Sequence, residues 1–164
     1  MTERKLLDEA QSYFLNFDGL CEPKNPRGVA TYGIVVKKGG KTIHEESGLA
    51  DAEPWTNEAS NNVAEYSGIL RGLRWLSEHG HAKSPVIVRG DSRLVLNQMN
   101  GVFKVKAPRI IELYKESKEL ASQFSDIRFE WVDRSQNSEA DLLTRIAYRR
   151  YIRDSKKPSK QFAH

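Results

Sequence analysis

The order in which strand-like and helix-like segments follow one another constrains this fold more than any other feature of the sequence. Three segments rich in β-branched and aromatic residues come first, and helical patterns then alternate with two short apolar segments. This β-β-β-α-β-α-α-β-α order predicts one α/β domain in which a three-stranded meander precedes strands joined through helices. The predicted strands are 13–17, 29–37, 41–49, 85–89 and 127–132, and the predicted helices are 63–79, 94–100, 109–124 and 139–151.

Turn-forming residues set the expected boundaries in the first part of the chain. The first strand is expected to stop at Asp18 and Gly19, and segment 20–27 is predicted to be a loop because it contains two prolines. The pair Gly39 and Gly40 favours a hairpin turn between the second and third strands. We therefore expect a polar extension at 1–12, a domain at 13–152 and a basic tail at 153–164.

Length and composition limit the class of protein. The 164 residues are enough for one domain with a sizeable core. The apolar runs are too short to span a bilayer and the N-terminus lacks the apolar core of a signal peptide, so we expect a cytoplasmic monomer without membrane contact. Cys21 is the only cysteine, which excludes an internal disulfide and a thiolate metal cage. The net charge of +4 is compatible with a nucleic-acid partner, although charge alone is a weak signal.

Four acidic residues stand out by their positions. Asp18 ends the first predicted strand and Asp91 ends the fourth, each beside a glycine. Glu65 and Asp141 lie in the first turns of the long helix and the last helix. Sites in open α/β sheets gather where strands end and chain paths diverge. If the first and fourth strands are neighbours, the four carboxylates would lie together.

Such a cluster suits divalent cations. Carboxylates in close proximity repel one another and raise their own pKa values unless a cation neutralises them. Mg²⁺ prefers oxygen ligands, and two such ions can activate a water molecule and stabilise the leaving oxygen of a phosphodiester. A site made only of Asp and Glu points away from zinc. The pattern therefore predicts two Mg²⁺ ions, with Mn²⁺ as a substitute.

Each acid also has a structural interpretation. Asn62 and Glu65 have the spacing of a capping box, and Asp91 has the position of a helix cap. Asp141 suits a helix dipole and Asp18 suits a turn. One such coincidence is ordinary, but four in a single ordered pattern are not.

Four short blocks of the sequence occur in a fixed order with characteristic gaps. The blocks are Tyr13-Phe-Leu-Asn-Phe-Asp18-Gly19, Asn61-Asn62-Val-Ala-Glu65, Gly90-Asp91-Ser92 and Asn137-Ser-Glu-Ala140-Asp141. Together they make residues 13–150 resemble the type 1 ribonuclease H family, most closely its archaeal branch and the related reverse-transcriptase-like ribonuclease H domains. The resemblance implies a ribonuclease H-like fold, a five-stranded mixed sheet with its first three strands antiparallel, flanked by helices.

The resemblance also implies an enzyme. The implied activity is a metal-dependent endonuclease that hydrolyses the RNA strand of RNA–DNA hybrids and leaves 5′-phosphate and 3′-hydroxyl ends. By position, the four metal-binding and catalytic acids would be Asp18, Glu65, Asp91 and Asp141. The implied substrate contacts are Gly19, Cys21, Asn61, Asn62, Ser92 and Asn137. For Asn62 helix capping remains a second role, and for Cys21 a small, partly buried residue is the simpler interpretation.

Two departures from the family pattern matter. Many relatives carry a loop histidine shortly before the last aspartate, whereas no histidine lies between His81 and His164 here. Arg134 is the nearest polar candidate, and because arginine stays protonated we expect it to position a phosphate or to make a surface salt bridge. The basic protrusion of many bacterial relatives is short here. Lys104 and Lys106 are candidates to contact the substrate backbone, or they form a solvated surface.

Two other functions compete with this interpretation. A different nuclease on the same fold would act on double-stranded RNA, which shares A-form geometry with hybrids, or on DNA as an integrase does. The fourth acid, Asp141, argues against an integrase pattern. A non-catalytic hybrid-binding module is the second rival, but such a module would be expected to lose at least one of the acids.

Overall fold

Five strands form one mixed sheet at the centre of the molecule. The structure is a computed structural model that describes residues 2–156, without the side chains of residues 7–9. The strands are β1 (Tyr13–Glu22), β2 (Val29–Lys38), β3 (Lys41–Leu49), β4 (Pro85–Gly90) and β5 (Asp126–Trp131). Their order is β3-β2-β1-β4-β5, with β1, β2 and β3 antiparallel and β4 and β5 parallel to β1. The predicted five-stranded mixed sheet is confirmed.

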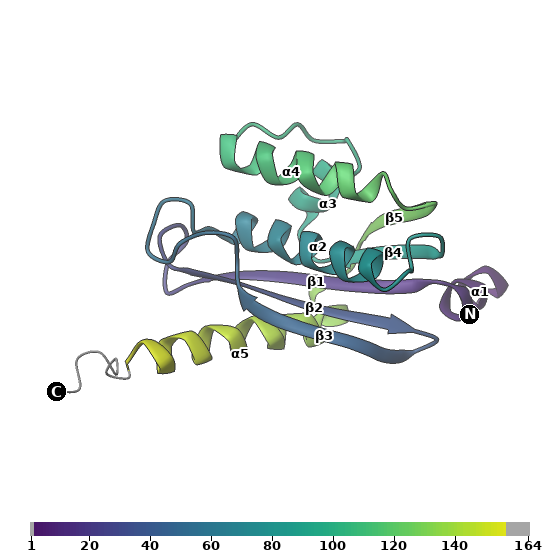
Figure 1. Ribbon diagram of the computed structural model, residues 1–164, viewed down its shortest axis with the longest axis horizontal. Coiled ribbons are helices and arrows are strands. Elements are labelled where there is room, and N and C mark those ends of the chain that lie inside the picture. The colour runs from purple at the N-terminus through teal and green to yellow at the C-terminus, as the bar shows by residue number, and fades with distance from the viewer. Residues whose placement is uncertain (1, 157–164) are drawn as a thin grey trace.

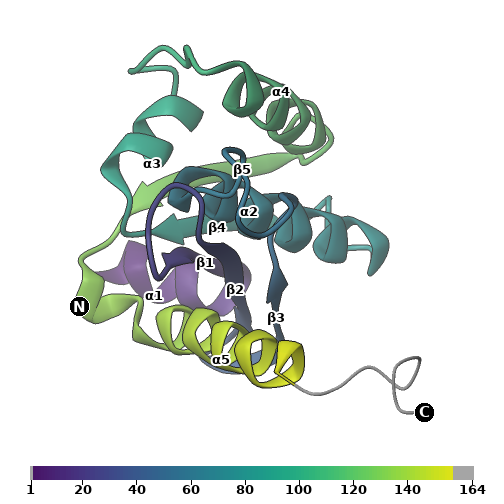
Figure 2. The same cartoon turned by 90° about the vertical axis from the view of Figure 1, so that its left-hand side faces the viewer.

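Helices cover both faces of the sheet. They are α1 (Glu3–Gln11), α2 (Asn61–Glu78), α3 (Arg93–Met99), α4 (Pro108–Ala121) and α5 (Ser138–Ser155), with a short 3₁₀ turn η1 (Arg134–Gln136). Figure 1 shows α2, α3 and α4 above the sheet and α5 below it, and in the view of Figure 2, turned by 90°, α4 again lies above the sheet and α5 below it. Among the described residues, no helix is long and apolar enough to cross a bilayer.

The core lies between the sheet and α2. One stripe of α2 is apolar, and its side chains are almost fully buried against inward-facing residues of β1 and β2. On the opposite face α5 approaches β2 closely, because a Cβ on Gly33 would lie 2.5 Å from the Ala140 carbonyl oxygen. The stripe and its partners include Ile69, Leu70, Leu73, Leu76, Leu15, Phe17 and Ile34.

Two predicted ends are too early by four residues or more, and the helix predicted to end at residue 124 ends at Ala121. β1 does not stop at Asp18 but continues to Glu22, because Leu20 and Cys21 pair with Thr31 and Ala30 on β2. The last helix continues to Ser155, one turn beyond the predicted end. It therefore includes the start of the segment predicted to be a tail, and residues 157–164 of that segment lie outside the described residues.

Candidate active site

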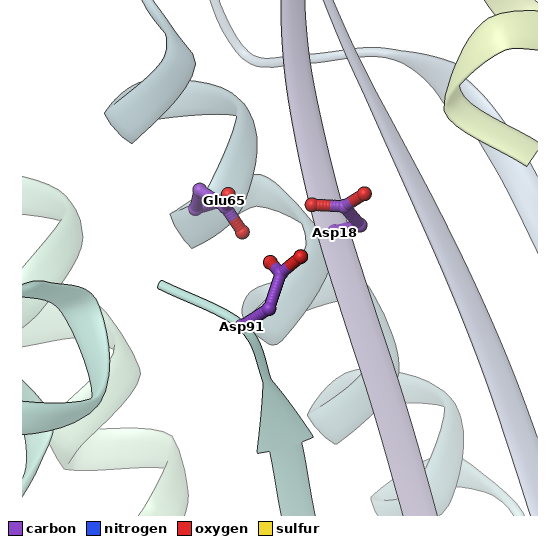
Figure 3. A group of neighbouring side chains, drawn as sticks. All are labelled: Asp18, Glu65 and Asp91. Atoms are coloured by element: carbon purple, nitrogen blue, oxygen red, sulfur yellow. The ribbon is translucent and has the colours of Figure 1, made fainter. Parts of the chain in front are cut away.

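Three carboxylates from distant parts of the sequence meet at one point. Asp18 lies on β1, Glu65 on α2 and Asp91 just after β4, and one carboxylate oxygen of each lies within 4.8 Å of the others. Figure 3 shows the three side chains pointing toward one another. The topology explains this meeting, because β1 and β4 are parallel neighbours in the sheet.

A glycine lets α2 approach β1 at this point. A Cβ on Gly19 would lie 2.5 Å from the backbone nitrogen of Glu65 and 2.7 Å from the carbonyl carbon of Ala64. Contacts that short are not tolerated, so only glycine fits between the strand and the helix. The backbone N–H of Gly19 also donates to Asp18 Oδ1 at 2.9 Å. The Gly19 N–H therefore orients the Asp18 carboxylate, and the absence of a side chain at Gly19 lets α2 bring Glu65 close to it.

Serines, not the acids, cap the neighbouring helices. The Ser60 hydroxyl accepts a hydrogen bond from the Val63 N–H at the start of α2, and Ser92 accepts from the Val95 N–H at the start of α3. The structural interpretations of Glu65 and Asp91 as capping residues are therefore wrong.

Burial and mutual repulsion raise the pKa values of the clustered carboxyl groups. Asp18 is 6% exposed and Glu65 is 2% exposed. Burial, with the nearby Asp91 charge, raises the pKa of Asp18 to about 7. Burial raises the pKa of Glu65 well above its ordinary value, and the Asp18 charge adds to the shift. Glu65 Oε2 is buried without a hydrogen-bond partner among the described residues. A buried carboxylate oxygen left unpaired beside two other carboxylates fits a bound cation.

The fourth predicted acid lies in the same hollow but outside this tight group. Asp141 is in the first turn of α5, as predicted, and is close enough to Asp18 to help raise the pKa of that carboxyl. Its Oδ2 lies 3.3 Å from Arg145 Nε, one turn further along the helix. The structure thus places Asp141 at the edge of the cluster, where an arginine holds it.

The carboxylates open into a polar hollow of about 430 Å³. Arg134 lies at its edge, with Nε 3.8 Å from Asp91 Oδ2 and a side chain that is 88% exposed. Burial raises the pKa of Asp91, and the Arg134 charge opposes that shift. The remaining lining residues are Gly19, Leu20, Cys21, Glu22, Asn25, Asn61, Ser92, Trp131, Asp133 and Arg145.

Asn137 is hydrogen-bonded to β1 and to Asp91 beside the carboxylate cluster. It is 1% exposed, its side-chain amide donates to the Phe17 carbonyl oxygen at 2.9 Å, and its Oδ1 accepts from Asn16 Nδ2 at 3.1 Å. A hydrogen bond from Asn137 also lowers the pKa of Asp91. The Asn137 side chain is thus covered by the protein and positions the segments that carry Asp18 and Asp91, and its contact with a substrate stays a prediction.

The other predicted substrate residues divide into two groups. Gly19, Cys21, Asn61 and Ser92 line the hollow, whereas Asn62, Lys104 and Lys106 do not. Lys104 lines a separate hollow between α3 and α4.

The side chain of Cys21 is largely buried although it lines the hollow. Cys21 is buried, and its thiol donates to the carbonyl oxygens of Lys24 and Ala59 at 3.2 and 3.4 Å. The simpler interpretation of Cys21 as a small buried residue fits this environment.

Two residues at the hollow were missed by sequence reasoning. Trp131 donates its indole N–H to the Asp91 carbonyl oxygen at 3.1 Å and stacks under the Arg93 guanidinium at 4.1 Å. No local pattern marks this role. Arg145 follows Asp141 at the four-residue spacing of a helical ion pair, and this signal was readable in the sequence.

Comparison with known proteins shows which chains this one is similar to. The model of the family described as "Reverse transcriptase-like" matches residues 16–147. The bifunctional protein Rv2228c of Mycobacterium tuberculosis is 42% identical over 123 residues, which make up 75% of this chain and 32% of that protein. Ribonuclease HI of Halobacterium salinarum is 31% identical over 131 residues, 80% of this chain and 61% of that enzyme. The chain therefore spans about a third of the mycobacterial relative and less than two thirds of the halobacterial one.

Solved structures agree with these similarities. The N-terminal RNase H domain of Rv2228c superposes with a TM-score of 0.76 at 33% identity, covering 89% of this chain and 99% of that domain. RNase H1 of Halobacterium salinarum gives a TM-score of 0.74 at 26% identity, covering 85% and 98% of the two chains. LC11-RNase H1, solved in complex with an RNA/DNA hybrid, gives 0.75 at 30% identity, covering 85% and 99%.

Proposed function

Because this chain belongs to the type 1 ribonuclease H family, we propose that it is an endonuclease that hydrolyses the RNA strand of RNA–DNA hybrids. The observation that carries the proposal is the group of Asp18, Glu65 and Asp91, of which the first two are buried and the third partly buried, at the floor of an open polar hollow. A similar protein binds an RNA/DNA hybrid in its crystal structure, which supports the substrate class.

Divalent cations complete the site in this proposal. The donors are carboxylate oxygens only, and the unpaired Glu65 Oε2 lies among them, so Mg²⁺ or Mn²⁺ fits better than zinc. Asp18, Glu65, Asp91 and Asp141 would hold the ions. When bound there, a pair of such ions would supply an activated water and would neutralise charge on the leaving oxygen, and we expect products with 5′-phosphate and 3′-hydroxyl ends.

The protein's own side chains orient the substrate and the ligands. Arg134 is largely exposed at the edge of the hollow and stays protonated, so it can hold a phosphate oxygen beside Asp91 but cannot shuttle a proton. Asn137 fixes the Asp91 carboxylate and the Phe17 carbonyl, while Gly19 fixes Asp18. These contacts hold the carboxylates in place before substrate arrives, which lowers the reorganisation that the reaction requires.

Discrimination of RNA from DNA would come from contacts to the 2′-hydroxyl. Ser92 accepts the Val95 N–H and still has a hydroxyl proton to donate toward the hollow that it lines. Asn61 lines the same hollow, and Asn62 follows it at the start of α2. Double-stranded RNA offers the same hydroxyls in A-form geometry, so we include it as a secondary substrate.

The substrate panel that tests the proposal contains end-labelled RNA–DNA hybrid, double-stranded RNA and double-stranded DNA. Each is incubated with Mg²⁺, with Mn²⁺ or with chelator, using the wild type and Asp91→Asn. We expect metal-dependent cutting of the RNA strand of the hybrid, lost in the variant, with slower cutting of double-stranded RNA. A protein that binds the hybrid equally well with chelator and cuts it with neither metal would be a binding module, and the proposal would fail.

A further inference from the structure

The exposed side of α5 carries four arginines in close succession. Four-residue spacing separates Arg145, Arg149 and Arg153, which therefore lie about 6 Å apart along the helix axis. Arg150 directly follows Arg149 in the sequence. We call these four residues the arginine row. The opposite side of the helix faces the sheet through Ala140, Thr144 and Ala147, which are buried.

Two of the four arginines have no acidic partner among the described residues. Arg149, Arg150 and Arg153, with Ile146, line a surface hollow of about 410 Å³. Within the part of the chain that the structure describes, Arg149 and Arg150 form no ion pair, and Arg153 contacts its neighbour Asp154 at 3.2 Å. Like charges at this spacing destabilise a helix by a few tenths of a kcal/mol per pair. The helix dipole favours Arg153, in the last turn, but does not account for the arginines in the middle of the helix.

The arginine row is continuous with the carboxylate hollow. Arg145, its first member, lines that hollow and pairs with Asp141. From there the row extends for eight residues, or about 12 Å. In Figure 1, α5 runs from below the centre of the sheet toward the end of the molecule where the β1–β2 connection also lies. A linear ligand that enters the hollow can therefore continue along the row.

We propose that the arginine row binds the phosphate backbone of the RNA–DNA hybrid beyond the cleavage site. Guanidinium groups pair with phosphate oxygens through two parallel hydrogen bonds, and a row of them suits a repeating polyanion. Leu142 and Ile146 are exposed beside the row, at 54% and 37%, which would also suit an anionic lipid surface. Continuity with the carboxylates through Arg145 favours nucleic acid. This inference rests on the proposed function and extends its substrate contacts.

The test is hybrid binding by the full chain in chelator, followed by fluorescence anisotropy over a range of salt concentrations. The test variant is Arg149→Gln with Arg150→Gln. The matched control is Lys41→Gln with Lys83→Gln, which removes the same charge from two exposed lysines outside the hollow and outside α5. If two phosphate contacts are lost, the slope of log K against log salt falls by about 1.8, and affinity near 0.1 M salt drops about tenfold or more. The control should keep the wild-type slope.

The outcomes separate this inference from the proposed function. If the test variant keeps the affinity and slope of the control, the arginine row does not contact the hybrid and the inference is overturned, whatever the wild type cleaves. If the wild type cuts no hybrid but the test variant loses binding, the proposed function falls and the row stands. Unchanged hybrid binding together with lost binding to phosphatidylserine vesicles would overturn the inference by assigning the row to a membrane surface.

Discussion

Gly19→Ala is the substitution whose effect follows most directly from the geometry. The new methyl group would lie 2.5 Å from Glu65 N and 2.7 Å from Ala64 C, so the atoms that must give way belong to the backbone of α2 rather than to a flexible side chain. Overpacking a core costs about 1–3 kcal/mol, and a clash with backbone belongs at the upper end of that range. A loss of about 3 kcal/mol corresponds to a melting temperature lower by roughly 6–12 °C for a chain of this size.

Gly48→Ala is the matched control. Gly48 also lies in a strand of the sheet, but the atoms nearest to its added Cβ would be side-chain atoms of Tyr32, at 3.6 Å or more, which is ordinary contact. Thermal unfolding followed by circular dichroism should show a change of about 0.5 kcal/mol or less for this variant. Because the Gly19 variant should push Glu65 away from Asp18, we expect it also to lose the stabilisation that the proposed Mg²⁺ site would give the wild type. Equal melting temperatures for the two variants would refute the argument that β1 and α2 require a glycine at this contact.

Three further perturbations test the surroundings of the carboxylates. Asn137→Ala leaves the Phe17 carbonyl and the Asn16 amide without their buried partner. We therefore expect urea titration to show a free energy of unfolding lower by about 1–3 kcal/mol, and an unchanged free energy would contradict the bridging role. Burial raises the pKa of Asp18 to about 7, so its contribution to stability is complete below its ordinary pKa and is lost as pH rises through about 7. The free energy of unfolding of metal-free wild type should therefore fall between about pH 4 and 7 more than that of Asp18→Asn does, and parallel curves of stability against pH would contradict this. Arg134→Ala removes a largely exposed side chain, so the free energy of unfolding should change by about 0.5 kcal/mol or less. Cleavage of the hybrid should nevertheless slow, and unchanged cleavage would show that Arg134 forms only a surface ion pair.

The sequence was sufficient to predict the sheet and to select the carboxylates. The order of strands and helices restricts the topology strongly, and parallel pairing of β1 with β4 then brings together Asp18 and Asp91, which are far apart in the sequence. Glu65 joins them because α2 begins over the same point of the sheet. Asp18 and Asp91 could be found because an acid beside a glycine at a predicted strand end is a local pattern, and Glu65 because it lies in the first turn of a predicted helix.

Features that depend on pairing or on burial were not visible in the same way. β1 continues past Asp18 because its second half pairs with β2, and that pairing overrides the turn signals of segment 20–27. The N-cap of α2 is Ser60 and not Asn62. Because the helix begins two residues earlier than the capping-box pattern implies, Glu65 is not at the position that caps the helix. Asn137 stands in a block that suggested a substrate contact, and only its burial shows that it faces the protein interior.

The most direct test of the central claim is a Mg²⁺ titration of hybrid cleavage by the wild type and by Glu65→Gln. Glu65 carries the buried oxygen that has no partner among the described residues, and glutamine keeps its size while removing its charge. If the three carboxylates hold the catalytic cations, cleavage by the wild type should saturate with Mg²⁺. The variant should be at least about 100-fold slower at every Mg²⁺ concentration, because it loses one strong electrostatic contribution to catalysis. A variant that cuts the hybrid at the wild-type rate, with the same dependence on Mg²⁺, would contradict the assignment of this cluster as the catalytic metal site.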